Sequence, residues 1–154
     1  MMRVALAEVD IDAPIDVVWS VMADVDRYGE WNPFVTGIDV VGGGPAVAGV
    51  DVVLHVRSRR GIAGRTTERL TRFEPYVLEV EFLGPIARLG MIQGRRSQTL
   101  VPVDAACTRY RSEERFGGWG TLLLPLGTVQ DGFERHAAAL KARAEALFAQ
   151  SQGA

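Results

Sequence analysis

The sequence contains a single cysteine, Cys107, so no disulfide can form within the chain. It lacks any apolar run of the roughly 18–20 residues that a membrane-spanning helix needs. The short apolar stretch at the N-terminus turns acidic too early for a secretory signal peptide. These absences favour a reducing compartment, and we expect a cytoplasmic protein without stable membrane insertion.

Lysine is almost absent, because Lys141 is the only one among 17 basic residues, and the formal net charge is -2. Bulk charge therefore gives no reason to expect a nucleic-acid partner. Arginines do gather in one stretch, but we interpret them as solvent-face charges that discourage sheet aggregation, offset by nearby glutamates, and we expect no nucleic-acid binding. The stretch comprises Arg57, Arg59, Arg60, Arg65, Arg69 and Arg72.

Several catalytic signatures are also missing. The sequence has no G-x-S-x-G nucleophile motif, no P-loop and no G-x-G-x-x-G dinucleotide fingerprint. Its histidines, cysteine and aspartates do not recur at metal-ligand spacing. We therefore expect neither a metal nor a cofactor.

Apolar residues, in contrast, make up 47% of the 154 residues, an ordinary share for a globular protein. A chain of this length can bury roughly 68–70% of its unfolded surface in one core. We expect a single domain over residues 1–150 and a disordered tail over residues 151–154.

The first 31 residues predict a strand followed by two short helices. Residues 3–12 alternate between apolar and acidic side chains, which is typical of a strand with one buried face. Pro14 suits the first position of a helix, and apolar residues then recur at helical spacing to residue 24. A second short helix is expected over residues 26–31.

Residues 36–119 consist of alternating segments separated by turn signals such as the GGGP at residues 42–45. Six or seven strands at this spacing, with no helices between them, predict antiparallel pairing. The clearest strands are expected over residues 50–57, 65–73, 77–83, 92–103 and 107–116.

From about residue 121 the apolar spacing becomes helical and continues for more than five turns, with charged residues on the opposite face. This pattern predicts a long C-terminal helix. Its apolar stripe comprises Leu126, Val129, Phe133, Ala137, Leu140, Ala144 and Leu147.

This order of elements predicts a cavity. A twisted sheet of six or seven strands has a concave face, and one helix about 10 Å across cannot cover it. Many inward positions carry small side chains, including Ala5, Ala7, Val52 and Ala137. Small residues also allow a helix to approach the sheet closely, so this observation admits a solid interior as the alternative.

The sequence resembles the START-like helix-grip superfamily, and within it the polyketide cyclase/dehydrase-like (SRPBCC) group. The resemblance rests on IDAPIDVVWSVMADVDRYGEWNPF at residues 11–34, RRSQTLVPVDAACTRYRSEERFGG at 95–118 and PLGTVQDGFERHAAALKARAEAL at 125–147. It implies an α+β helix-grip fold in which a curved seven-stranded antiparallel sheet surrounds a long C-terminal helix, with two short helices after the first strand. The motifs are more specific for fold than for function.

Polar candidates lie on the last two strands. Arg109, Arg111, Glu113 and Arg115 share one face, which must be the solvent face because burying four charges is prohibitive. The opposite set, Tyr110, Ser112, Glu114 and Phe116, therefore points inward. On the preceding strand Arg96, Gln98 and Leu100 are expected to point inward as well.

We expect Arg96 to pair with Glu114, because a buried carboxylate needs a partner. The pair is interpreted either as a structural ion pair or as a polar handle or acid/base pair for a ligand. The candidate catalytic residues are Arg96, Tyr110, Ser112 and Glu114.

Aromatic and apolar residues complete the predicted ligand site. Trp31 and Phe34 either fix the small helices or contact the ligand, and Trp119 has the same two interpretations. His136 borders the apolar stripe, either in the cavity or at its edge, whereas His55 is expected to face solvent. The predicted ligand-binding residues are Trp31, Phe34, Leu54, Val56, Gln98, Tyr110, Glu114, Phe116, Trp119, Phe133 and His136.

Three functions follow from the cavity and the resemblance. The first is a carrier or sensor of a small hydrophobic molecule such as a lipid, polyketide or aromatic metabolite. The second is a polyketide cyclase, aromatase or dehydratase that uses the polar residues. The third is a protein-interaction module resembling chaperone-ATPase activators, which requires an exposed apolar patch. Candidates for the patch are Ile86, Leu89 and Leu122, Leu123 and Leu124, and the apolar loop at residues 122–126 is also compatible with a homodimer.

Overall fold

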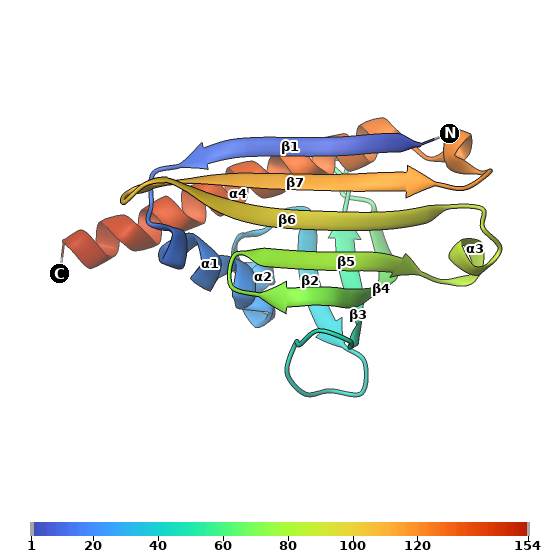
Figure 1. The fold of residues 1–154 in the computed structure, drawn as a ribbon, viewed down its shortest axis with the longest axis horizontal. Coiled ribbons are helices and arrows are strands. Elements are labelled where there is room, and N and C mark those ends of the chain that lie inside the picture. Colours follow the sequence, from blue (N-terminus) through green and yellow to red (C-terminus); the bar gives the residue numbers. More distant parts are fainter. Residues whose placement is uncertain (1, 154) are drawn as a thin grey trace.

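A seven-stranded antiparallel sheet with the strand order β1-β7-β6-β5-β4-β3-β2 forms the framework of the protein. It is seen in a computed structural model that describes residues 2–153. A long helix, α4 (Leu126–Gln152), lies behind the β1 and β7 side of the sheet (Figure 1). The predicted helix-grip fold is confirmed. The strands are β1 (Arg3–Ile11), β2 (Val35–Val40), β3 (Asp51–Arg57), β4 (Ala63–Glu74), β5 (Val77–Leu83), β6 (Gln93–Asp104) and β7 (Cys107–Gly117).

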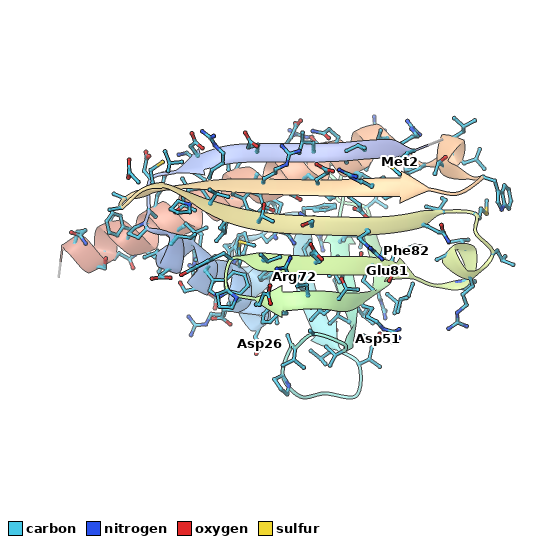
Figure 2. All side chains as sticks on the ribbon, in the orientation of Figure 1. Met2, Asp26, Asp51, Arg72, Glu81 and Phe82 are labelled. Carbon is cyan, nitrogen blue, oxygen red and sulfur yellow. The ribbon has the colours of Figure 1, made fainter. Side chains whose placement is uncertain are left out.

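The two faces of the sheet follow the alternation of the sequence. In β1, Ala5, Ala7 and Ile11 are buried, because every second side chain points to the helix side. Arg72 and Glu81 lie on the face turned away from α4 (Figure 2). The predicted inward set on β6 and β7 is buried or lines the cavity, and the charged set on β7 faces solvent.

Two short helical segments follow β1, as the sequence predicts. They are α1 (Ile15–Ala23), and α2 (Tyr28–Trp31) preceded by a 3₁₀ turn at Val25–Arg27. Pro14 directly precedes α1, where its fixed φ of -59° and missing N–H are tolerated. The buried Tyr28 hydroxyl donates to the Met22 carbonyl at 2.7 Å, which joins the two segments.

One further short helix was not expected. The segment α3 (Pro85–Arg88) separates β5 from β6. Gly84 has a φ of +136°, which turns the chain out of the strand, and Pro85 then starts a helical turn. The prediction that no helix interrupts the run of strands is therefore wrong.

The C-terminal helix begins later and ends later than the sequence suggested. It spans Leu126–Gln152. The helix does not begin before Pro125, because a proline disfavours a helical conformation in the residue that precedes it. The preceding Thr121–Leu123 form only a 3₁₀ turn. At the other end, α4 runs two residues into the segment predicted to be disordered, and Ala154 lies outside the described residues.

Helix α4 packs on the inner face through an apolar stripe in which Phe133, Ala137, Leu140 and Ala144 are buried. Gly132 allows a close approach, since a Cβ there would lie 2.4 Å from the Phe34 ring. No helix within residues 2–153 is both long and apolar enough to cross a membrane.

Three of the six arginines of the basic stretch, Arg59, Arg69 and Arg72, are paired with carboxylates. Arg59 binds Asp131 of α4, and Arg69 binds Asp51 at 2.7 Å. Such exposed pairs contribute little stability, but they reduce the free positive charge of this region.

Candidate functional site

A cavity of about 420 Å³ lies between the sheet and the first half of α4. Its volume falls within the range of roughly 300–1,000 Å³ that small-molecule sites occupy. Strands β2 to β7, α3 and α4 all contribute to its wall, which is largely apolar. The apolar side chains that line it are Phe34, Val35, Leu54, Val56, Ile62, Ala63, Phe82, Ile86, Ile92, Phe116, Leu124, Val129 and Phe133.

The cavity is open to solvent, because some of the side chains that line it are exposed. Ile62 in the β3–β4 turn and Ile86 in α3 both line the cavity, and their side chains are also exposed. The opposite end is closed by buried side chains from α2, β6, β7 and α4. The interior is therefore accessible to a ligand from one side.

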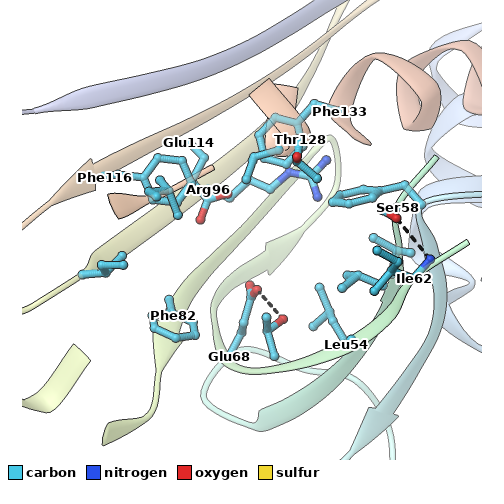
Figure 3. Close-up of a pocket in the computed structure, with 18 of the residues that line it drawn as sticks. Leu54, Ser58, Ile62, Glu68, Phe82, Arg96, Glu114, Phe116, Thr128 and Phe133 are labelled. Carbon is cyan, nitrogen blue, oxygen red and sulfur yellow. Dashed lines mark hydrogen bonds between the residues drawn. The ribbon is translucent and has the colours of Figure 1, made fainter. Parts of the chain in front are cut away.

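Three ionisable side chains interrupt the apolar wall: Glu68 of β4, Arg96 of β6 and Glu114 of β7. The carboxyl groups of Glu68 and Glu114 point into the same space (Figure 3). Glu68 accepts a hydrogen bond from the Thr66 hydroxyl at 3.1 Å. This polar wall can orient the polar end of a ligand whose remaining surface is apolar.

The environment of Glu114 favours its neutral form. Burial, reinforced by the negative charge of Glu68 and partly offset by Arg96, raises the pKa of Glu114 to about 8. Burial also raises the pKa of Glu68. Two carboxyl groups that share a site of low polarity do not both ionise readily. At neutral pH the Glu114 carboxyl is therefore protonated and can donate a hydrogen bond.

The predicted ion pair between Arg96 and Glu114 does not form. The two residues lie opposite each other in the β6–β7 register, but they are absent from the ion pairs of the described chain. Instead, the Arg96 Nε donates to the Ser112 hydroxyl at 2.9 Å, and the guanidinium lies 4.0 Å from the centre of the Phe133 ring. A cation over an aromatic face is an attractive arrangement. The Arg96 guanidinium therefore contacts Phe133 of α4 instead of the Glu114 carboxyl group. Its Nη2 has no partner within residues 2–153.

A cluster of buried polar side chains lies next to Arg96, deeper in the protein than the cavity. The His136 ring stacks on Tyr110 with ring centres 6.0 Å apart, and Tyr110 donates to Gln98 at 2.8 Å. A second cavity of about 20 Å³ lies here, bordered by Arg96, Gln98 and His136.

The Asn32 amide fixes the protonation of His136. Its Oδ1 accepts from the backbone N–H of Phe34 and of Val35, so its Nδ2 must donate to His136 Nδ1 at 3.0 Å. The imidazole proton therefore lies on Nε2. Burial, together with the Arg96 charge, lowers the pKa of His136 well below its ordinary value, so His136 is neutral.

The structure divides the predicted site residues into three groups. Trp119 is 70% exposed and lies outside the cavity lining, because it follows the end of β7 and its indole donates to the Leu89 carbonyl. Trp31 packs against Tyr28 and His136 rather than lining the cavity. Those that line the cavity are Phe34, Leu54, Val56, Arg96, Glu114, Phe116 and Phe133, whereas Gln98, Tyr110, Ser112 and His136 lie in the deeper cluster.

Sequence reasoning missed Glu68, which was counted among the glutamates that offset the arginines. The sequence of β4 could have identified Glu68, because every second side chain of a strand lies on the same face. Glu68 lies two residues before Leu70, which is buried, so both belong to the inner face of the sheet. His55 lies at the surface as expected, 2.6 Å from an Asp39 carboxylate oxygen. In the described part of the chain, no group of three or more His, Cys, Asp or Glu is placed to hold a metal ion.

The sequence matches the model of one protein family over most of its length. The model for the family described as "polyketide cyclase / dehydrase and lipid transport" matches residues 2–145. The chain belongs to this family. A search of curated proteins by sequence finds no match.

Several solved structures share the fold of this chain. The Zhui aromatase/cyclase from Streptomyces sp. R1128 aligns over 94% of both chains with 21% identity and a TM-score of 0.74. A START superfamily protein from Mycobacterium smegmatis has 16% identity and a TM-score of 0.65, covering 96% of this chain and 98% of that one. Ginseng major latex-like protein 151 from Panax ginseng has 10% identity and a TM-score of 0.74, with the same coverage. At these identities the likeness concerns the fold.

Proposed function

We propose that the protein binds a small hydrophobic molecule in the cavity between the sheet and α4, as a carrier or sensor. The observation that carries the proposal is the cavity of about 420 Å³ with its largely apolar wall. Burying apolar ligand surface there stabilises a complex by about 25 cal/mol per Å² removed from water, before the costs of association. The family includes lipid transport in its description, which supports the same class of ligand.

The polar wall sets which ligands fit best. Glu68, Arg96 and Glu114 all extend into the cavity from the sheet, so a ligand with one polar end and an apolar body satisfies both the polar and the apolar parts of the wall. A fully apolar molecule would leave the polar groups without partners, which costs affinity.

Blocking the cavity is expected to weaken binding of the probe strongly. Val129 lines the cavity from α4, and Val129→Trp would place an indole in the space that the ligand occupies. Titration with the neutral fluorescent probe N-phenyl-1-naphthylamine should show a loss of affinity of at least about tenfold. The loss of only two methylene-sized contacts, at about 0.8 kcal/mol each, already produces this effect. Native mass spectrometry of the purified protein should detect a retained small molecule in the wild type.

The matched control is Val101→Trp, because Val101 is an exposed residue of β6 on the far side of the sheet. This variant should bind the probe as the wild type does. Unchanged affinity in Val129→Trp, with the fold intact by circular dichroism, would show that the probe does not use the cavity and would contradict the proposal.

A cyclase or dehydratase activity is the second candidate, favoured by one observation. Glu114 combines a position in the wall of the cavity with a pKa of about 8, and a general acid or base works best when its pKa is near the operating pH. Arg96 lies on the same wall and can polarise a ligand carbonyl.

This activity predicts a specific defect. If the protein converts an aromatic polyketide analogue, Glu114→Gln should lower the rate by about 10²–10⁴-fold, the usual contribution of a positioned acid or base. Probe affinity should remain unchanged, because glutamine preserves the shape of the side chain. Product analysis by liquid chromatography checks the rate, and turnover that survives in Glu114→Gln would remove Glu114 from the mechanism.

A further inference from the structure

A set of large apolar side chains faces solvent, and two of them, Ile62 and Ile86, also line the cavity. Five of them have exposed fractions between 69% and 74%, and Ile86 is 39% exposed. Such a concentration on the surface usually marks a contact site. We call this set the apolar rim; it comprises Ile62, Ile86, Leu89, Trp119, Leu122 and Leu123.

The apolar rim is an ordered structure built from chain segments that are distant in sequence. The Gly120 N–H donates to the Met91 carbonyl at 2.7 Å, and the Trp119 indole donates to the Leu89 carbonyl, which joins the segment after β7 to the α3 segment. The Arg3 guanidinium of β1 donates to the carbonyls of Thr121 and Leu124. Leu122 and Leu123 are therefore held outward by hydrogen bonds on both sides.

The free charges beside the rim are positive. Arg60 lies two residues before Ile62, and Arg88 directly precedes Leu89. Both are exposed, and neither takes part in an ion pair or side-chain hydrogen bond among the described residues. The nearby carboxylate of Asp131 is already bound by Arg59 and Arg135. The surface around the rim thus combines exposed apolar side chains with unpaired arginines.

We propose that the apolar rim is a docking surface for a lipid bilayer that contains anionic lipids. Leucines and isoleucines on separate turns can enter the acyl region, a tryptophan is suited to the headgroup level, and flanking arginines attract anionic headgroups. Because Ile62 and Ile86 of the rim also line the cavity, a hydrophobic ligand would pass between bilayer and cavity beside these two side chains. The docking is peripheral and reversible.

A second copy of the chain is the competing occupant. A stable protein interface needs about 800 Å² on each partner with close complementarity of shape. The rim instead consists of side chains on three separate turns, and Ile62 and Ile86 among them line an open cavity. Separate projecting turns fit a fluid bilayer better than a rigid partner surface, and a partner would also close the cavity.

Sedimentation with vesicles tests the proposal. The protein should cosediment with vesicles of phosphatidylcholine and phosphatidylglycerol in equal amounts, and less with phosphatidylcholine alone. The double variant Leu122→Ser/Leu123→Ser should lose at least about tenfold in apparent affinity, because two apolar side chains leave the bilayer. Arg60→Gln and Arg88→Gln should each lose about fivefold with anionic vesicles only.

The matched control is Val101→Ser/Val103→Ser, which removes two exposed apolar side chains of β6 that are not part of the rim. It should bind vesicles as the wild type does. Vesicles should also shift the tryptophan emission to shorter wavelength, and Trp119→Phe should abolish the shift, because Trp19 and Trp31 are already partly buried.

Two results would overturn the proposal. One is the absence of cosedimentation and of an emission shift. The other is a dimer in analytical ultracentrifugation that Leu122→Ser/Leu123→Ser dissociates, which would assign the rim to a second copy. Probe binding in the cavity is measured without vesicles, so its outcome is independent of both.

Discussion

Asn32→Ala is expected to lower the free energy of unfolding by about 3 kcal/mol, because it leaves three buried polar groups without partners. Asn32 is 3% exposed, and its side chain binds the N–H groups of Phe34 and Val35 together with the His136 ring. The loss should extend to the cavity. Phe34 lines it and takes its backbone position from Asn32, so the affinity for N-phenyl-1-naphthylamine should fall as well.

Denaturant unfolding followed by circular dichroism measures this effect. Asn32→Asp separates the two roles of the side chain, because aspartate accepts from both backbone N–H groups but does not donate to His136. Its loss of stability should be smaller, and the pKa of His136 should rise beside the new carboxylate. A loss in Asn32→Ala below about 1 kcal/mol would show that the network contributes no more than one ordinary hydrogen bond.

Glu114→Gln is expected to make the protein more stable in alkaline solution. Burial and the Glu68 charge raise the pKa of Glu114 to about 8, above the value of about 4.3 in the unfolded chain. Between these two values the native state holds the proton more tightly, so wild-type stability falls as the pH rises. Glutamine has no proton to lose. The variant should match the wild type near pH 4 and gain about 5 kcal/mol near pH 9, since the two pKa values differ by about 3.7 units and each unit is worth about 1.36 kcal/mol.

Unfolding free energies measured across this pH range check the expectation. Glu113→Gln is the matched control, since Glu113 is the next residue on β7 but lies on the outer face. Hydrogen bonds from Arg111 and Arg115 lower the pKa of Glu113, so ionised Glu113 stabilises the fold, and its removal should give no alkaline gain. Equal stability of Glu114→Gln and the wild type at pH 9 would mean that the Glu114 carboxylate is well solvated in the folded protein.

Most of the fold could be predicted from the sequence, because within each long strand or helix the same spacing of apolar residues recurs several times. The alternation in β1 and β7 and the apolar stripe of α4 are local patterns, and each is tied to one secondary structure. The elements that were placed wrongly depend on single residues. Pro85 begins α3 and Pro125 delays α4, and a proline can either interrupt an element or start one.

The site was less predictable, because side-chain partners depend on distances that periodicity does not contain. Parity correctly turned Arg96 and Glu114 inward, but it did not show that Phe133 of α4 competes for the guanidinium. The same limit applies to Trp119. Its direction is decided by a hydrogen bond to Leu89 in a distant segment, and sequence alone gives no information on that contact.

The position of β1 at one end of the sheet has a consequence for biosynthesis. Within the described residues β1 pairs with β7 alone, with Arg3 opposite Phe116, so the strand of this sheet that is made first pairs with the strand that is made last. At typical rates of translation the apolar side of β1 waits roughly ten seconds for that partner. Pairing of β1 and packing of α4 therefore follow the synthesis of the other strands of the sheet, which makes the nascent chain a natural client for chaperones that shield unpaired strands.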